Sequence, residues 1–288
     1  MGADLHKADF GEIYNEPDAR AYYRTLGQYD YRIPEHGAAM FRRLLQPQAQ
    51  HAPGDRELRA PKTVLDVCCS YGVLAGLLKT DLSIDDLYRH YQDPGMDGLS
   101  VEDAAEVDRK YIAEHAIADQ PRMLGLDIAG NAVSYAESAG LLDTGFVENL
   151  ESDEPSDRLR AVMSDVDLII TTGGVGYVTD TTFARLLAAA KPTVWVASFC
   201  LRAYDYAPIR RVLDSHGLHT EQAARTFEQR RFVDADEQRW SIDQVREWGL
   251  DPAGREDDGY YHANFYLSRP ADEARRLPAG ELIPDVFA

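Results

Sequence analysis

The sequence is poor in cysteine and has no long hydrophobic run. Its 288 residues include three cysteines, two of them adjacent (Cys68 and Cys69) and the third distant (Cys200). That spacing provides neither a disulfide framework nor a set of metal ligands, so we expect a reduced compartment and no bound metal. No apolar segment approaches the ~20 residues that cross a bilayer, and the first residues contain no basic or apolar signal region. We therefore expect a soluble, cytoplasmic protein that does not act at a membrane.

Positive charge is also scarce. Against 49 Asp and Glu residues stand 30 Lys and Arg residues, which gives a formal net charge of −19. A protein that binds nucleic acid needs a basic face to neutralise phosphates. The pairs Arg42 with Arg43 and Arg275 with Arg276 are too small and too far apart to form one, so we expect no nucleic-acid partner. The length suits one elaborated domain of about 200 residues or more, or two small ones.

The most informative segment is residues 63–72 (TVLDVCCSYG), which lead into the apolar run 73–79. The first half is aliphatic, as is typical of a buried parallel strand, and residues 70–72 form a turn that opens a helix. Backbone N–H groups at a helix start have no partner within the helix and can bind carboxylates, phosphates or hydroxyls. A dinucleotide-binding fold would show three glycines here and a ribose-binding acid about 20 residues later, and neither is present.

Residues 64–72 resemble the first motif of class I S-adenosylmethionine (SAM)-dependent methyltransferases, VLDVGCGxG, with Cys68 and Ser70 in place of two glycines. The resemblance implies that Asp66 orients the methionine amino group and that the following backbone lies against the methionine and the ribose. The two replaced glycines narrow the turn, so either these side chains point away from the ligand or the cofactor lies differently. The expected cofactor-binding residues of this segment are Asp66, Cys68, Cys69, Ser70, Tyr71 and Gly72.

A second motif follows at residues 122–128, an apolar run that contains Asp127 and precedes the helix expected at 131–140. By the resemblance, Asp127 chelates the two ribose hydroxyls, because its two carboxylate oxygens can accept both protons. As a lone Asp it could equally cap the helix that follows. Ile128 is expected beside it in the cofactor site.

The remaining segments complete a fold by the same resemblance. Asn149 ends one expected strand and would contact the adenine amino group, while Thr172 ends the next, ahead of a glycine-rich loop. The expected strands are residues 145–150, 166–174 and 193–199, followed by an antiparallel pair at 225–233 and 260–268. We therefore expect an α/β fold, Rossmann-like and of the class I methyltransferase type, with a seven-stranded, mostly parallel sheet and helices on both faces.

Two segments lie outside the core of this fold. Residues 1–60 are expected to form an N-terminal helical cap, with a helix at 37–45 and a linker at 46–55, and residues 61–288 the SAM-binding catalytic domain. That domain contains a helical insertion at about 80–118, which we expect to fold over the active site, and a loosely held tail at 269–288. The cap contains tyrosines that could form an aromatic wall or simply pack against helices, namely Tyr14, Tyr22, Tyr23, Tyr29 and Tyr31.

The candidate catalytic residues are expected near the carboxyl edge of the sheet. Arg202 would suit an acceptor carboxylate, Asp205 an amine and His262 a hydroxyl proton, and a structural role is open for each. Tyr177 would lie near the reaction centre, with Tyr204 as a further orienting group.

The resemblance predicts a SAM-dependent methyltransferase that modifies an O or N atom of a small molecule, in specialised metabolism. Two alternatives stay open. The sulfonium also activates the aminocarboxypropyl carbons, so the site could catalyse cyclisation or aminocarboxypropyl transfer and release methylthioadenosine. The protein could also be a non-catalytic SAM-binding module. The N-terminal cap is compatible with a homodimer.

Overall fold

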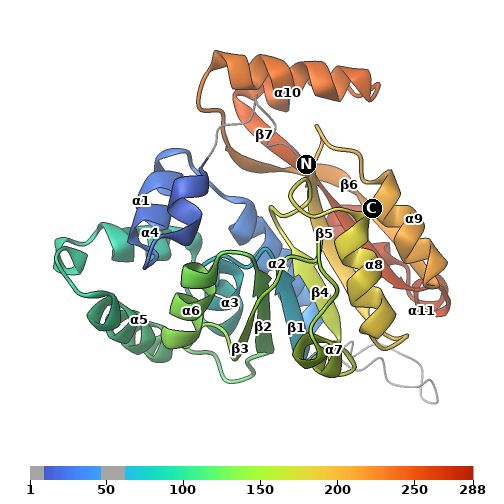
Figure 1. Cartoon of the computed structure of the whole chain (residues 1–288). Coiled ribbons are helices and arrows are strands. Elements are labelled where there is room, and N and C mark those ends of the chain that lie inside the picture. Colours follow the sequence, from blue (N-terminus) through green and yellow to red (C-terminus); the bar gives the residue numbers. More distant parts are fainter. Residues whose placement is uncertain (1–9, 47–61, 288) are drawn as a thin grey trace.

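The computed structural model describes residues 10–46 and 62–287. Its strands are β1 (Thr63–Val67), β2 (Arg122–Asp127), β3 (Thr144–Val147), β4 (Leu168–Thr171), β5 (Trp195–Leu201), β6 (Leu218–Arg231) and β7 (Tyr260–Pro270). They form one seven-stranded sheet in the order β3-β2-β1-β4-β5-β7-β6 (Figure 1). The first five strands are parallel, and β7 runs antiparallel between β5 and β6. The predicted fold, with its terminal antiparallel pair, is confirmed.

Helices bury both faces of the sheet. One face is covered by α2 (Ile33–Leu45), α3 (Val73–Lys79) and α6 (Gly130–Ser138), the other by α7 (Asp157–Met163), α8 (Asp180–Ala189) and α9 (Ala207–Ser215). Along β1, Val64 belongs to the first hydrophobic cluster, whereas Leu65 and Val67 belong to the second. The aliphatic run in β1 follows from this arrangement, because side chains alternate between two faces and both are covered.

The described part of the predicted N-terminal cap consists of a short 3-10 helix, η1 (Gly11–Asn15), and the helices α1 (Arg20–Gln28) and α2. The helix α2 starts earlier than expected, at Ile33, because Pro34 occupies its first turn, where the missing N–H costs no hydrogen bond. The predicted boundary at residue 60, and the linker apart from Gln46, lie outside the described residues. The division into two parts stays a prediction.

The insertion is helical as expected, but its predicted place is wrong. It contains α4 (Ile84–Gln92), the short 3-10 helix η2 (Pro94–Met96) and α5 (Val101–Glu114). Ser83 and Asp86 form the reciprocal capping box at the start of α4. However, α4 packs on α1 and α5 packs on α6, and no insertion residue lines the cleft described below. The insertion therefore supports the N-terminal helices from the side and lies outside the lining of that cleft.

The predicted loose tail is also wrong, because the C-terminal residues pack on the sheet. After β7 come α11 (Ala271–Arg276), α12 (Ala279–Leu282) and α13 (Pro284–Phe287). Ile283 and Val286 are buried in the same hydrophobic cluster as Phe265 of β7. The few apolar residues of this segment are widely spaced in the sequence, so their burial is evident only in the tertiary structure.

Helix α10 (Ala235–Glu247) was not predicted from the sequence. It follows β6 and precedes β7 along the chain, and it projects beyond the ends of these strands (Figure 1). Asp234 caps it by accepting hydrogen bonds from the backbone N–H groups of Asp236 and Glu237. This Asp followed by two further acids is a recognisable helix start and could have revealed the element. Across the described ranges, no helix is long and apolar enough to cross a membrane.

Candidate functional site

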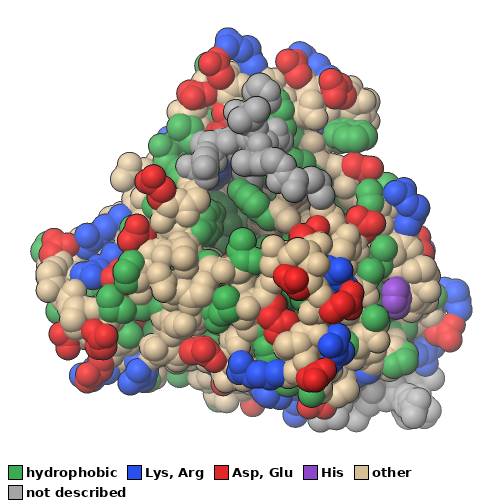
Figure 2. All heavy atoms as spheres, in the orientation of Figure 1, with side chains coloured by type: hydrophobic (Ala, Val, Ile, Leu, Met, Phe, Trp, Pro, Cys, Tyr) green, Lys and Arg blue, Asp and Glu red, His purple; other side chains and the backbone are tan. Residues whose placement is uncertain are grey.

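A large cleft opens at the carboxyl ends of the parallel strands β1 and β4, where the strand order reverses. From β1 the chain continues to β2 on one side, and from β4 it continues to β5 on the other side. Its volume is about 1950 Å³. Figure 2 shows the hollow, with hydrophobic side chains on its walls and acidic side chains to its right. Single-ligand pockets measure about 300–1000 Å³, so this cleft has room for two ligands side by side. In open α/β sheets, the point where the strand order reverses is the usual place for a ligand.

The cleft brings together most of the residues that the sequence singled out. Those that line it are Asp66, Cys68, Cys69, Ser70, Asp127, Ile128, Asn149, Thr172, Tyr177 and Asp205, together with the cap tyrosines Tyr14, Tyr22 and Tyr31. Four other predicted site residues do not line it, namely Tyr71, Gly72, Arg202 and His262.

Tyr71 and Gly72 support the site without lining the cleft. The Tyr71 side chain is buried, and its hydroxyl donates to the carbonyls of Ile13 and Glu16 at 3.0 and 2.9 Å, which holds η1 at the cleft. Gly72 caps α3 with φ +75°, and a Cβ there would lie 3.0 Å from Leu141. Both residues therefore position the turn through packing and backbone geometry.

Arg202 and His262 are engaged elsewhere. The Arg202 guanidinium lies 2.5 Å from a Glu256 carboxylate oxygen, and both side chains are almost fully buried. His262 is buried in β7, and its Nε2 lies 3.2 Å from Asp258. Ligand atoms of Glu228, Asp258 and His262 lie within 4.8 Å of one another, so this cluster, outside the cleft lining, could hold a metal ion.

The turn after β1 has the backbone shape of a glycine loop without the glycines. Cys68 and Ser70 have φ values of +62° and +48°, a left-handed conformation that costs non-glycine residues about 1–2 kcal/mol each. A glycine in β2 and a glycine in the loop after β4 make room for the sulfur atoms. A Cβ on Gly174 would lie 2.8 Å from Cys68 Sγ, and a Cβ on Gly125 would lie 2.7 Å from Cys69 Sγ. The Cys68 and Cys69 side chains therefore pack against the backbone at Gly174 and Gly125.

This strain predicts an unusual order of stability at position 68. We expect Cys68→Gly to be more stable than Cys68→Ala by about 1 kcal/mol, because only glycine adopts φ +62° without cost. At an unstrained position the order reverses, since glycine loses more backbone entropy on folding. Chemical denaturation of the two variants gives the comparison, and an alanine variant as stable as the glycine variant would contradict the strain.

Asp127 ends β2 and holds the turn in place. Its Oδ2 accepts a hydrogen bond from the Ser70 N–H at 2.8 Å, and its Oδ1 accepts one from the Ala129 N–H at 3.0 Å. Burial raises the pKa of this carboxyl, and the backbone hydrogen bonds oppose the rise. Each oxygen keeps a further lone pair, so the carboxylate can still accept two hydroxyl protons from a ligand.

Asp66 is a buried carboxyl without a counter-charge among the described residues. Its side chain lines the cleft, is only 2 % exposed, and accepts no hydrogen bond from the described residues. Burial, together with the nearby Asp127 charge, raises its pKa well above the usual range. Because an unpaired buried carboxylate is costly, this position favours a ligand that brings a positive charge.

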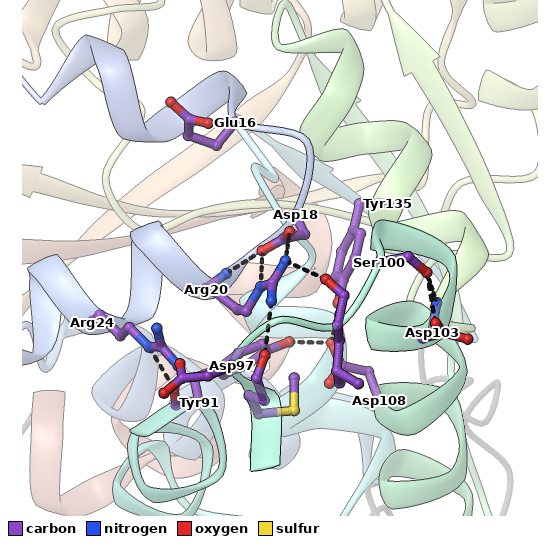
Figure 3. Close-up of polar contacts among 12 residues, drawn as sticks. Glu16, Asp18, Arg20, Arg24, Tyr91, Asp97, Ser100, Asp103, Asp108 and Tyr135 are labelled. Atoms are coloured by element: carbon purple, nitrogen blue, oxygen red, sulfur yellow. Dashed lines mark hydrogen bonds and ion pairs between the residues drawn. The ribbon is translucent and has the colours of Figure 1, made fainter. Parts of the chain in front are cut away.

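The wall formed by η1 and α1 is anchored to the insertion (Figure 3). The Arg20 guanidinium donates to both carboxylate oxygens of Asp18 and to the carbonyls of Met96 and Leu99, at 2.7 and 3.1 Å. These bonds connect the start of α1 to the segment between α4 and α5. The insertion therefore fixes the helix that carries Tyr22 into the cleft.

A second buried group links three helices behind this wall. Asp108 of α5 is buried and accepts hydrogen bonds from the hydroxyls of Tyr91 in α4 and Tyr135 in α6, at 2.5 and 2.6 Å. His90 Nε2 lies 2.7 Å from its other oxygen. Since all partners are protein groups, this carboxylate is part of the support for the cleft.

The structure also adds acidic residues that the sequence analysis missed. Glu151 accepts hydrogen bonds from the Thr179 N–H and the hydroxyls of Thr179 and Thr182, at 2.7–2.8 Å, which ties the loop after β3 to the start of α8. The other missed acids of the lining are Glu148, Asp180, Asp234, Asp236 and Glu237. They come from loops and from the first turns of α8 and α10, whose mutual approach depends on the sheet.

No family model and no curated protein matches the chain. Among solved structures, the chain is similar to a TehB-like SAM-dependent methyltransferase from Corynebacterium glutamicum (15 % identity, 85 % of this chain and 97 % of that one, TM-score 0.39). It is also similar to a SAM-dependent methyltransferase from Aquifex aeolicus (15 %, 91 % and 100 %, 0.41) and to the plantazolicin methyltransferase BamL (12 %, 91 % and 100 %, 0.44). Sequence identities and TM-scores this low do not indicate a function, so a proposal for the function has to rest on the chemistry of the cleft.

Proposed function

We propose that the protein is a SAM-dependent methyltransferase that acts on an N or O atom of a small molecule, with a role in specialised metabolism. The observation that carries the proposal is the pair of carboxyls on the neighbouring strands β1 and β2. Asp66 is buried without a counter-charge from residues 10–46 or 62–287, and Asp127 is held at the cleft by backbone N–H groups. One position suits a cation and the other a vicinal diol, and SAM contains both.

Other cleft residues suit the rest of the cofactor. Asp66 would hold the methionine ammonium group, and Asp127 would accept hydrogen bonds from the ribose hydroxyls. Ile128 is 69 % exposed although it is apolar, which offers a surface for the adenine ring. Asn149 lies on the same side of the cleft and has an amide suited to the adenine amino group.

When bound, SAM supplies an electrophilic methyl group, which an acceptor lone pair attacks while the electron pair of the carbon–sulfur bond returns to sulfur. The protein has to align the acceptor and exclude water. Apolar side chains such as Val73, Leu74 and Val175 line the cleft and suit water exclusion. Tyr177 and Asp205 lie on the cleft lining and would orient the acceptor, and Asp205 could accept its proton.

The unusual turn supports a second candidate, attack on the aminocarboxypropyl carbons. Cys68 and Ser70 carry side chains where the resembled motif has none, and both line the cleft. A displaced methionine arm would present different carbons of the sulfonium. Mass spectrometry of the nucleoside product separates the two reactions, because methyl transfer yields S-adenosylhomocysteine and the alternatives yield methylthioadenosine.

Calorimetric titration with SAM and S-adenosylhomocysteine tests the proposed site. We expect both to bind, and Asp127→Asn to weaken binding about tenfold, a loss of about 1.4 kcal/mol. The amide keeps one acceptor oxygen, but its NH₂ group would face a backbone N–H that now donates to the carboxylate. The exposed Asp243→Asn in α10 is the matched charge control. Failure of both nucleosides to bind would overturn the proposed function.

A further inference from the structure

We propose that the acceptor is an organic cation, bound between tyrosines and carboxylates on the β4 and β5 side of the cleft. This inference rests on the proposed function, because it names the substrate class of the same site. Three observations support it: the arrangement of aromatic rings, the sign of the charges that line the cleft, and the positions of Arg202 outside the lining and Asp205 within it.

The acceptor side is distinct from the side assigned to the cofactor. Asp66 lies in β1, Asp127 ends β2 and Asn149 follows β3. Tyr177, in contrast, follows β4, and Asp205 follows β5. The start of α10 closes this second side, with Val233, Asp234 and Asp236 in the lining. The total volume of about 1950 Å³ leaves space there for a ligand besides the nucleoside.

Three tyrosines from separate parts of the chain lie near one another where the two sides of the cleft meet, since Tyr14 is close to Asp127 as well as to Tyr31 and Tyr177. Tyr14 comes from η1, Tyr31 from the segment before α2, and Tyr177 from the loop after β4. A Cβ on Gly173 would lie 2.9 Å from the Tyr31 hydroxyl, so Tyr31 lies directly against that loop. Burial raises the pKa of Tyr14 and of Tyr31, and the nearby Tyr177 contributes to both shifts, which keeps these phenols neutral. Neutral phenol rings attract cations through their faces.

The charges of the lining have one sign. Within the described ranges, the cleft is lined by no Lys, Arg or His, and by nine acids, namely Asp66, Asp127, Glu148, Glu151, Asp180, Asp205, Asp234, Asp236 and Glu237. Arg230 lies behind the lining, but Glu237 holds it in a two-pronged ion pair with distances of 2.6 and 2.9 Å. This pair neutralises Glu237, and burial raises the pKa of Asp66 and of Asp127, so the negative field of the cleft comes mainly from the other six acids. Such a field attracts a cation and repels an anion.

From the sequence, Arg202 would suit an anionic acceptor and Asp205 a cationic one. Arg202 is paired with Glu256 and donates to the Asp251 carbonyl at 2.8 Å, outside the cleft lining. Asp205 lies in the lining, is exposed, and accepts a hydrogen bond from the Ala207 N–H at 2.8 Å. The group suited to a carboxylate is thus used internally, and the group suited to an ammonium ion faces the ligand.

Three probes of equal shape and different charge test the inference. The full chain is first saturated with S-adenosylhomocysteine, and 2-phenylethylamine, 2-phenylethanol and phenylacetate are then titrated by ligand-observed NMR. We expect the ammonium ion to bind at least about tenfold more tightly than the alcohol, phenylacetate not to bind, and added salt to weaken the ammonium complex. Equal affinities, preference for phenylacetate, or no binding of any probe at millimolar concentration would overturn the inference.

Matched variants assign the effect to the cleft. Asp205→Asn keeps an oxygen for the Ala207 N–H, so the fold is retained, and we expect it to weaken 2-phenylethylamine binding severalfold without changing the alcohol. Asp243→Asn changes the net charge equally at an exposed site outside the cleft and should leave both affinities unchanged. Equal losses in the two variants would show a general charge effect and overturn the inference. Absence of S-adenosylhomocysteine binding in the first step would instead count against the proposed function.

Discussion

Replacing Glu237 by glutamine is expected to lower the free energy of unfolding by about 3–5 kcal/mol, because it leaves the Arg230 charge buried without its partner. Arg230 and Glu237 are each only 3 % exposed in their side chains, and two hydrogen bonds join them. Glu237 also accepts a hydrogen bond from the Val233 N–H at 2.8 Å, which fixes the entry to α10. Chemical denaturation measures the loss.

Two further variants show whether the buried pair is the cause. Glu247→Gln lies in the last turn of the same helix on the exposed side and should change stability by less than about 0.5 kcal/mol. Replacing both partners, with Arg230→Met and Glu237→Leu together, should recover most of the loss, because no charge then stays buried. A Glu237→Gln variant as stable as the Glu247→Gln control would contradict the role of the ion pair.

Asp66→Asn is expected to stabilise the protein without ligand and to weaken SAM binding. The neutral amide has nearly the same shape and removes the cost of burying an ionisable carboxyl that no described residue pairs, a gain of about 1–3 kcal/mol at about pH 8. The same change removes a charge-assisted contact to a cationic ligand, worth about 1.5–3 kcal/mol, or at least about tenfold in affinity. Opposite effects on stability and on binding are expected where a buried carboxyl destabilises the free protein and binds a cationic ligand.

The stability gain should depend on pH. Burial and the Asp127 charge raise the pKa of Asp66 in the folded protein, so the folded state binds this proton more tightly than the unfolded state. The wild type therefore loses stability as the pH rises from about 3.9 toward the raised pKa, and the loss is constant above it. Thermal unfolding of both proteins across this range, with and without SAM, gives the comparison. A gain that shrinks with rising pH would contradict the assignment.

The strands and the two acids of the cofactor side could be predicted because their signals are local. The aliphatic run of β1 and the acid at position 127 show in short stretches, and their order along the chain matches the observed sheet. Strand ends were less accurate, since β6 starts at Leu218 and the prediction placed its start at 225. Its polar residues alternate with apolar ones over only part of its length, and pairing with β7 extends it further.

Arg202 and His262 show why the acceptor side could not be predicted in the same way. Both lie close in sequence to the carboxyl edge of the sheet, and only the tertiary structure places Glu256 against Arg202 and Asp258 against His262. The placement of the insertion failed for a similar reason, because its helices are amphipathic and the sequence does not say which surface they cover. Its contacts with Arg20 and Tyr135 join residues far apart in the chain (Figure 3).

The sequence by itself determined the alternation of strands and helices, the turn after β1 and the positions of Asp66 and Asp127, because periodicity and motif spacing act over a few residues. The tertiary structure alone decided that Asp66 is buried with no counter-charge in the part of the chain that the structure describes, that Cys68 and Ser70 adopt glycine-like angles, and that the lining of the cleft is acidic. Burial and charge sign at a site depend on which loops the sheet brings together, and that information is distributed over the whole chain.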